Sequence, residues 1–133
     1  MLTGPNGLPQ TGFMARSLPT PAALVFEVLG INHLWPGNWV NWHYRCLGKD
    51  PMVASLVDQP AGAFFMFRRT AWQQLSGFDE RFWPVWFEDV DFCARLRAAG
   101  FFVRYDPKAR AIHQGGALGG SDSAGDQGEI LVW

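Results

Sequence analysis

The sequence predicts a small α/β domain. Three segments support this class: a short apolar run at residues 59–67, an amphipathic segment at residues 88–99, and a second apolar run at residues 101–107. Short apolar runs bounded by turn-forming residues are typical of buried strands, whereas apolar positions three and four residues apart are typical of a helix packed on one face. Strands that alternate with helices along the chain are the pattern from which α/β domains are built.

The composition agrees with one folded domain and argues against two classes of function. The chain has 133 residues, 48% of them hydrophobic, which is enough to bury a core. Charged residues make up only 17% and the net charge is −1, so the basic surface that nucleic acid requires is not expected. No apolar run is long enough to cross a bilayer, and the first residues do not resemble a secretory signal peptide. We therefore expect a protein of the cytoplasm or of the cytoplasmic face of the membrane.

The two cysteines, Cys46 and Cys93, are predicted to be reduced core thiols. Two isolated cysteines form neither a disulfide framework nor a paired metal-binding motif. This use of cysteine is typical of a reducing compartment.

The N-terminal residues 1–21 are rich in Gly, Pro, Thr and Asn, which predicts loops and turns. A helix is expected next, because Thr20 can cap it and Pro21 suits its first turn. Its apolar face is predicted at Leu24, Val28 and Ile31.

The middle of the chain, residues 32–58, has no clear period and is predicted to be irregular. Residues 59–67 are expected to form a buried strand. A short helix then follows, capped by Thr70 and ended by Gly77.

A second, longer helix is predicted to start at Glu88 and to end before Gly100. Strands are expected at residues 101–107 and 109–116, the second ending in a glycine-rich turn. We thus predict one domain over residues 1–116 and a flexible tail over residues 117–133. The buried face of the helix is expected to carry Phe92, Leu96 and Ala99.

Three carboxylates, Glu88, Asp89 and Asp91, fall in the first turn of that helix. One interpretation is structural, because acids near a helix N-terminus stabilise it by about 0.3–1 kcal/mol each and Asp91 can pair with Arg95. A metal held by Asp89 and Asp91 together is disfavoured, since side chains two residues apart leave a helix in divergent directions.

The other interpretation of these carboxylates is a carbohydrate site. Aromatic rings cover the C–H faces of sugars while carboxylates accept their O–H groups, and a carboxylate against an apolar wall suits a general base. The aromatic residues just before the cluster are Phe82, Trp83, Trp86 and Phe87.

Two further features leave alternatives open. His113, at the end of a predicted strand, is either a histidine bonded to the backbone or a contact to a metal ion or phosphate. Gly62 and Ala63 mark either tight packing or the close approach of a ligand.

Residues 59–116 carry, in order, AGAFFMFRR, SGFDERF, EDVDF and AIHQGG. This ordered set resembles the C-terminal part of bacterial family 2 glycosyltransferases, especially the rhamnosyltransferase-like members. A looser similarity reaches back to residue 4, and Ser76 stands where many relatives have glycine. The resemblance implies part of a GT-A, Rossmann-like fold, with a few strands flanked by helices.

The resemblance also implies roles for individual residues. Asp89 would be the general base of an inverting transfer from a nucleotide-diphosphate sugar to a glycan or lipid-linked acceptor, and the similarity suggests rhamnose as the sugar. Glu88 and Trp86 would line the acceptor site, and Gly62 and Ala63 would lie near the transferred sugar. His113 would complete the coordination of Mg²⁺ or Mn²⁺ on the donor diphosphate.

Relatives begin with a nucleotide-binding half, which has no counterpart in this sequence. From this we expect the C-terminal half of a catalytic domain, inactive alone and prone to associate through an exposed sheet edge. A non-catalytic carbohydrate-binding module is the alternative. A metal-dependent hydrolase ranks last, because a second histidine in the cluster is missing.

Overall fold

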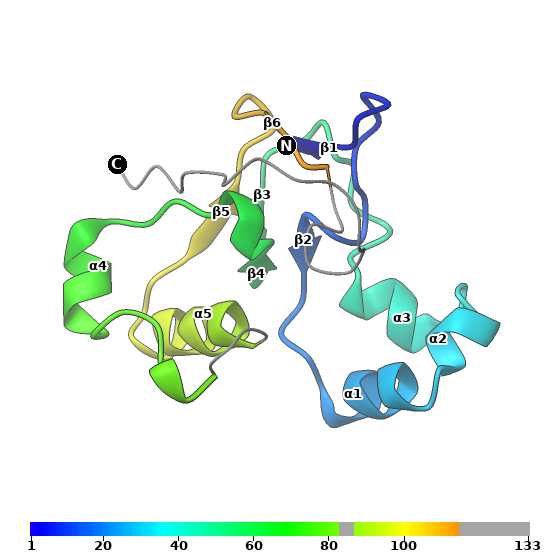
Figure 1. Cartoon of the computed structure of the whole chain (residues 1–133), viewed down its shortest axis with the longest axis horizontal. Helices are drawn as coiled ribbons and strands as arrows, with labels where there is room; N and C mark the ends of the chain where they lie inside the picture. The colour runs from blue at the N-terminus through cyan, green and yellow to red at the C-terminus, as the bar shows by residue number, and fades with distance from the viewer. Residues whose placement is uncertain (83–86, 115–133) are drawn as a thin grey trace, which may run out of the picture.

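The computed structural model describes residues 1–82 and 87–114. Figure 1 shows short strands lying between two groups of helices, one formed by the first half of the chain and one by the second. The strands are β1 (Leu2–Thr3), β2 (Ala15–Arg16), β3 (Ser55–Val57), β4 (Gln59–Pro60), β5 (Val103–Tyr105) and β6 (Ala111–Ile112). The helices are α1 (Pro21–Val28), α2 (Ile31–Leu34), α3 (Trp39–Tyr44), α4 (Arg69–Gln74) and α5 (Glu88–Ala98), with 3-10 turns η1 (Gly62–Phe64) and η2 (Glu80–Phe82).

The strands in the described ranges form three separate pairs. β1 and β6 are parallel, whereas β2 pairs with β4 and β3 pairs with β5 in antiparallel fashion. The predicted mixture of helices and strands is confirmed. The finer prediction, half of a GT-A fold, stays a prediction, since the strand pairs do not join into one sheet in this part of the chain.

Helix α5 begins and ends as the sequence predicts, and it supplies the larger core. Phe92 is fully buried, and Leu96 and Cys93 are buried beside it, but Ala99 is exposed because it lies at the C-terminal cap. Gly100, with φ of +83°, ends the helix in the left-handed region that favours glycine. Against the buried cluster of Ala71, Phe92 and Leu96 pack the side chains of Phe65, Phe67, Trp72, Leu75, Phe101 and Val103.

A second core joins the two ends of the described chain. The sequence predicted only loops and turns for residues 1–21, and this is wrong for β1 and β2. Met1, Leu2 and Met14 are buried together with Ala61. The physical reason is that β1 pairs with β6, which lies more than 100 residues later in the chain. A local sequence pattern does not predict a pairing over that distance.

The strand predicted for residues 59–67 is also largely wrong. Only Gln59 and Pro60 pair with a neighbouring strand, and the chain then turns through η1. The N–H of Ala61 still donates to the carbonyl of Met14, at 3.1 Å, and this is followed by the turn bond from Phe64 to Ala61. Gly62 and Ala63 thus lie in an exposed turn rather than in a buried strand.

The helix after this turn differs from the prediction at its start. α4 begins at Arg69 with Arg68 as its cap residue, so Thr70 lies inside the first turn and is not the cap. Its end is as predicted, because Gly77 has φ of +71° and its N–H bonds back to the carbonyl of Trp72.

Helix α1 has the predicted cap but not the predicted buried face. Thr20 accepts a hydrogen bond from the N–H of Ala23 at 3.2 Å. Leu24 and Val28, however, are 39% and 85% exposed. Ile31 falls in α2, where it is half-buried.

Residues 32–58 are not irregular, since they contain most of α2 together with α3 and β3. The helices of this region are joined by buried asparagines. Asn38 caps α3 by accepting from the N–H of Asn41 at 2.8 Å, and it donates to Asn32 at 3.0 Å. Asn32 in turn donates to Glu27 of α1. Amide groups, rather than an apolar seam, therefore hold α1, α2 and α3 together. Because these contacts are polar, residues 32–58 lack the hydrophobic periodicity from which helices are predicted.

In the described part of the chain, every helix is too short or too polar to traverse a lipid bilayer.

Candidate functional site

The site is built around the first turn of α5, which starts from a strained residue. Phe87 precedes the helix with φ of +71°, a left-handed conformation that is uncommon for any residue but glycine. Strain of this kind costs about 1–3 kcal/mol and is concentrated at functional sites.

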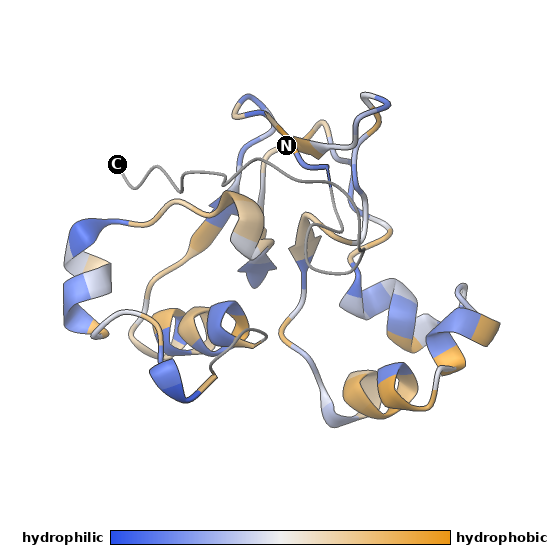
Figure 2. Ribbon diagram, viewed as in Figure 1, coloured by the Kyte–Doolittle hydropathy of each residue, from blue (hydrophilic) through white to orange (hydrophobic). Residues whose placement is uncertain are grey.

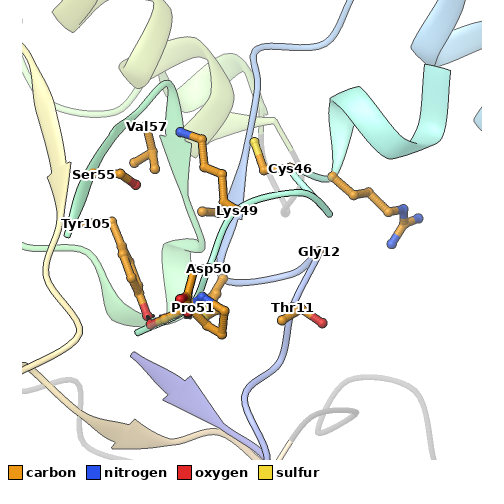
Figure 3. Close-up of a pocket in the computed structure, with 12 residues that line it drawn as sticks. Thr11, Gly12, Cys46, Lys49, Asp50, Pro51, Ser55, Val57 and Tyr105 are labelled. Atoms are coloured by element: carbon orange, nitrogen blue, oxygen red, sulfur yellow. Dashed lines mark hydrogen bonds between the residues drawn. The ribbon is translucent and has the colours of Figure 1, made fainter. Parts of the chain in front are cut away.

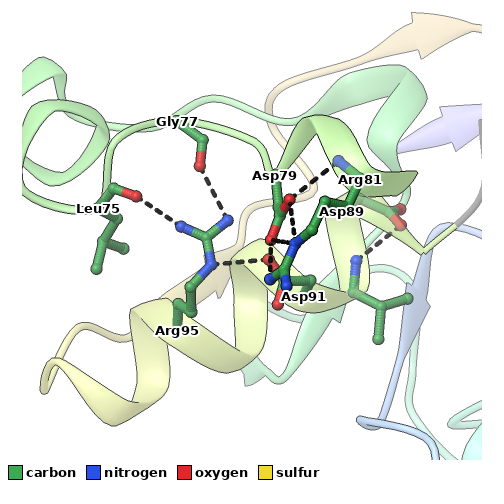
Figure 4. Close-up of polar contacts among 8 residues, drawn as sticks. Leu75, Gly77, Asp79, Arg81, Asp89, Asp91 and Arg95 are labelled. Atoms are coloured by element: carbon green, nitrogen blue, oxygen red, sulfur yellow. Dashed lines mark hydrogen bonds and ion pairs between the residues drawn. The ribbon is translucent and has the colours of Figure 1, made fainter. Parts of the chain in front are cut away.

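Asp89 lies at a junction of three elements. Its Oδ2 accepts a hydrogen bond from Nε2 of Gln59, in β4, at 3.3 Å. Its Oδ1 accepts from the N–H of Val90 at 2.8 Å (Figure 4). A Cβ built on Gly62, in η1, would lie only 3.2 Å from Oδ2. The structure thus brings together two of the predicted site residues, Asp89 and Gly62, and leaves the carboxylate half-buried.

Two buried oxygen atoms beside this junction accept no hydrogen bond from the described residues. They are Oε1 of Gln59 and Oε2 of Glu88. A buried acceptor without a donor costs about 1–3 kcal/mol, so it calls for a physical explanation. A ligand rich in hydroxyl groups would supply the missing donors, because each hydroxyl donates one hydrogen bond.

Asp91, the third carboxylate, has a structural role, as one of the two interpretations predicted. Its Oδ2 accepts from Nε of Arg95 at 2.7 Å. The same guanidinium donates to the carbonyls of Leu75 and Gly77 at 2.7 and 2.9 Å, so it fastens α5 to the end of α4 (Figure 4). The negative charge of Asp91 is therefore already paired with the guanidinium of Arg95.

Two side chains near the site have shifted pKa values, one because of burial and one because of hydrogen bonds to an arginine. Burial raises the pKa of the Cys93 thiol to about 12, and the negative charge of Asp89 adds to the shift. Cys93 is therefore an inert core thiol, as predicted, while Cys46 is only half-buried. On the surface, hydrogen bonds from Arg81 lower the pKa of Asp79 to about 2 (Figure 4).

His113 follows β6 directly, at the end of a strand as predicted. Its backbone N–H donates to the carbonyl of Thr3 at 2.9 Å. Its ring stacks on Phe13 with centroids 5.0 Å apart, and its Nδ1 lies 3.2 Å from Oε1 of Gln10. These contacts do not include Asp89, so among the described residues the two predicted functional groups are not brought into direct contact.

The metal that the resemblance implies can be compared with the donors present. His113 offers an imidazole nitrogen, a common ligand. Within residues 1–82 and 87–114, however, no three His, Cys, Asp or Glu side chains gather closely enough to hold a cation. Among the described residues, His113 alone of the predicted site is offered as a metal ligand. The further ligands that a complete metal site needs are not found beside it in this part of the chain.

The other predicted site residues have different outcomes. Trp86 lies outside the described residues. Ala63 is exposed in η1, next to Gly62. Sequence reasoning missed Gln59 and Gln10, since an isolated glutamine carries no chemical signature; a polar residue at the edge of an apolar run was the only signal for Gln59.

A hollow elsewhere on the protein is a weaker candidate (Figure 3). It lies between the loop after β1, the segment after α3, and the strands β3 and β5, and includes none of the predicted site residues. Two of its polar groups are already engaged, because the hydroxyl of Tyr105 donates to the carbonyl of Pro51 at 2.8 Å and Lys49 donates to that of Leu56 at 2.6 Å.

Comparisons with known proteins agree on one class. Residues 43–114, more than half of the chain, match the family profile described as the N-terminal domain of galactosyltransferase. N-acetylglucosaminyl-diphospho-decaprenol L-rhamnosyltransferase, from two strains of Mycobacterium tuberculosis, is 36% identical over 90 residues, covering 68% of this chain and 29% of the relative. Rhamnosyltransferase WbbL of Escherichia coli K12 is 37% identical over 59 residues, covering 44% of this chain and 22% of the relative.

The chain spans less than a third of the length of these curated relatives. No solved structure matches it.

Proposed function

We propose, on the premise that this chain belongs to the rhamnosyltransferase-like glycosyltransferases of family 2, that the start of α5 forms the acceptor side of an inverting sugar transfer. The observation that carries the proposal is the half-buried carboxylate of Asp89, held by Gln59 and facing a glycine. Gln59 and Glu88 each add a buried oxygen that accepts no hydrogen bond from the residues the structure describes. This arrangement suits a polyhydroxylated ligand.

In the proposed reaction, Asp89 is the general base. One carboxylate oxygen takes the proton of an acceptor hydroxyl while the oxygen of that hydroxyl forms a bond to the anomeric carbon of the donor sugar. The bond between this carbon and the diphosphate breaks with its electron pair, and the nucleoside diphosphate leaves. Gln59 fixes the orientation of the carboxylate, and Gly62, which has no Cβ, leaves room for that carboxylate beside η1.

The leaving diphosphate needs its own stabilisation. Mg²⁺ or Mn²⁺ supplies Lewis acidity to such a group when bound, and His113 is the residue of this chain that would hold it. Other ligands would come from outside the described residues, in keeping with the incomplete donor set found here.

The substrates follow from the relatives. One relative is named as a rhamnosyltransferase for a diphospho-decaprenol carrying N-acetylglucosamine. We propose a nucleotide-diphosphate sugar, rhamnosyl by this analogy, as donor and a glycan or lipid-linked glycan as acceptor, at the cytoplasmic face of the membrane. Glu88 and Trp86 are proposed to line the acceptor site.

The test is Asp89→Asn in the protein at its full natural length. Loss of the base should lower kcat by about 10²–10⁴-fold, the usual contribution of a general base, with donor binding unchanged. Activity is measured as release of nucleoside diphosphate in the presence of acceptor. Asp91→Asn is the matched control: it removes a carboxylate from the same turn, and should reduce stability while sparing turnover. Normal turnover in Asp89→Asn would remove Asp89 from the role.

A non-catalytic carbohydrate-binding module is the second candidate. Within residues 1–82 and 87–114, it is favoured by the lack of contact between Asp89 and His113 and by the incomplete set of metal ligands. Calorimetry on this chain separates the two functions. Binding of glycan without any binding of nucleotide sugar plus Mn²⁺, in the natural protein as well, would favour the module.

A further inference from the structure

The side chain of Gln10 makes two hydrogen bonds to a single residue, His113. Its Nε2 lies 3.1 Å from the backbone carbonyl of His113, and its Oε1 lies 3.2 Å from Nδ1 of the imidazole. The Gln10 backbone is fixed as well, because its N–H donates to the carbonyl of Leu2 at 3.0 Å, in the strand that pairs with β6. The position of the Gln10 amide relative to His113 is therefore fixed at both its backbone and its side chain.

The first of these contacts determines which way round the amide lies. A backbone carbonyl can only accept a hydrogen bond, so the atom of Gln10 that faces it must be the NH₂ group. The amide oxygen must then face Nδ1. An amide oxygen can only accept, so Nδ1 must carry a hydrogen and donate it.

We infer that Gln10 is a positioning residue, which holds the neutral imidazole of His113 as its Nδ1–H tautomer and thereby presents Nε2 as an electron-pair donor. The ring plane is fixed at the same time, because His113 stacks on Phe13 with an interplanar angle of 14°. None of the described residues hydrogen-bonds to Nε2.

The tautomer decides what His113 can bind. A neutral imidazole with a lone pair at Nε2 accepts a hydroxyl proton or coordinates a divalent cation, whereas donation from Nε2 to a phosphate oxygen would require the protonated ring or the opposite tautomer. Both contacts considered for His113, metal and phosphate, therefore stay open, and they differ in the protonation of Nε2. Any use of Nε2 in sugar transfer rests on the proposed function, but the role of Gln10 does not. A hydrogen bond to the second ring nitrogen is the usual device that orients a ligating histidine.

The test reads the tautomer directly, without turnover. The chain is labelled with ¹⁵N at histidine, and the ring nitrogens are observed by long-range ¹H–¹⁵N correlation well above the ordinary imidazole pKa of about 6.5. The wild type should show a protonated Nδ1 and a bare Nε2 at His113. Gln10→Met keeps the side-chain length but removes the acceptor, so the ratio of tautomers should change by about two- to tenfold, the effect of one hydrogen bond.

Controls separate this role from a general effect on folding. The rings of His33 and His43 lie in the same spectra and should not change in any variant. Thr11→Ala, at the neighbouring exposed position, should leave His113 as in the wild type.

Either of two results would overturn the inference: a wild-type His113 protonated at Nε2, or an unchanged tautomer ratio in folded Gln10→Met. The wild-type spectrum decides even if the methionine variant does not fold. Failure of the proposed function would appear elsewhere, as normal turnover in Asp89→Asn, and leaves this measurement unaffected.

Discussion

Gly62 lies so close to Asp89 that a single methyl group there would disturb the carboxylate. A Cβ at 3.2 Å from Oδ2 is tighter than ordinary van der Waals contact. We predict that Gly62→Ala lowers kcat/KM for the acceptor by about tenfold or more, because the carboxylate must shift by a few tenths of an ångström from its productive position. Steady-state kinetics at saturating donor measure the effect. Gly37→Ala is the matched control, since nothing lies within 4 Å of its Cβ.

Because of Cys93, we expect the free energy of unfolding to fall as the pH rises in the alkaline range. Its pKa is raised from the usual 9.0 to about 12, chiefly by burial, so the folded state keeps a proton that the unfolded state loses. The stabilisation is fully present below pH 9 and is lost as the pH rises towards 12. We predict that Cys93→Ala flattens the decline in the free energy of unfolding over this range, measured by urea titration at a series of pH values. An equally steep decline in the variant would assign it to other groups.

Asp89 and Asp91 show what the sequence could and could not say about the site. Both lie in one acidic turn, and the pairing of Asp91 with Arg95 followed from their spacing of four residues. The partners of Asp89 did not, since Gln59 and Gly62 come from a segment about 30 residues earlier. Local spacing predicts contacts along one helix, but not contacts between elements.

At the scale of elements, Asn38 combines two functions that variants can separate. It is 2% exposed, caps α3 through its oxygen, and donates through its nitrogen to Asn32 and to the carbonyl of Trp35. We predict that Asn38→Ala destabilises the protein by about 2–3 kcal/mol, the sum of a lost cap and of buried groups left unpaired. Urea denaturation followed by circular dichroism measures this.

Asn38→Asp tests the division between the two functions. The aspartate keeps an oxygen that can cap α3 but has no hydrogen to donate to Asn32. It should therefore restore helix α3, but not the packing of α2 against it. Full stability in Asn38→Ala would mean that the network contributes nothing.

The elements that the sequence predicts well are those with local signals. Thr20, Gly77 and Gly100 mark ends of α1, α4 and α5, because caps depend on one side chain or one left-handed residue. The prediction is wrong for residues 59–67, where the run of apolar residues predicts a buried strand but the chain turns at η1. Apolar composition alone does not distinguish these conformations.

At the scale of the whole molecule, α1, α2 and α3 direct polar groups inward and leave apolar ones outside. Figure 2 shows hydrophobic residues along α1 and at the ends of α2. Val28 and Trp39 are 85% and 75% exposed. Other large apolar side chains exposed in this region are Val25, Leu29, Leu34, Trp35 and Trp42. Surfaces of this kind favour association.

We predict that Val28→Ser combined with Trp39→Ser weakens self-association and leaves the free energy of unfolding nearly unchanged, because both side chains already face water. Sedimentation velocity over a range of concentrations measures the first quantity and urea titration the second. Val57→Ser is the control for burial, since that side chain is buried and its loss should destabilise the fold. Unaltered association in the double variant would instead favour contact through a sheet edge, as the sequence predicted.

The pairing of β1 with β6 has a consequence for how the protein is made. Gln10 leaves the ribosome 103 residues ahead of His113, to which it is hydrogen-bonded. At about 5–20 residues per second, this is a delay of roughly 5–20 s. During that interval β1 lacks its neighbour, and Met1 and Leu2 lack part of the core that covers them. The imidazole thus reaches its place well after Gln10, and a nascent chain interrupted before residue 111 carries an open edge that a chaperone would have to shield.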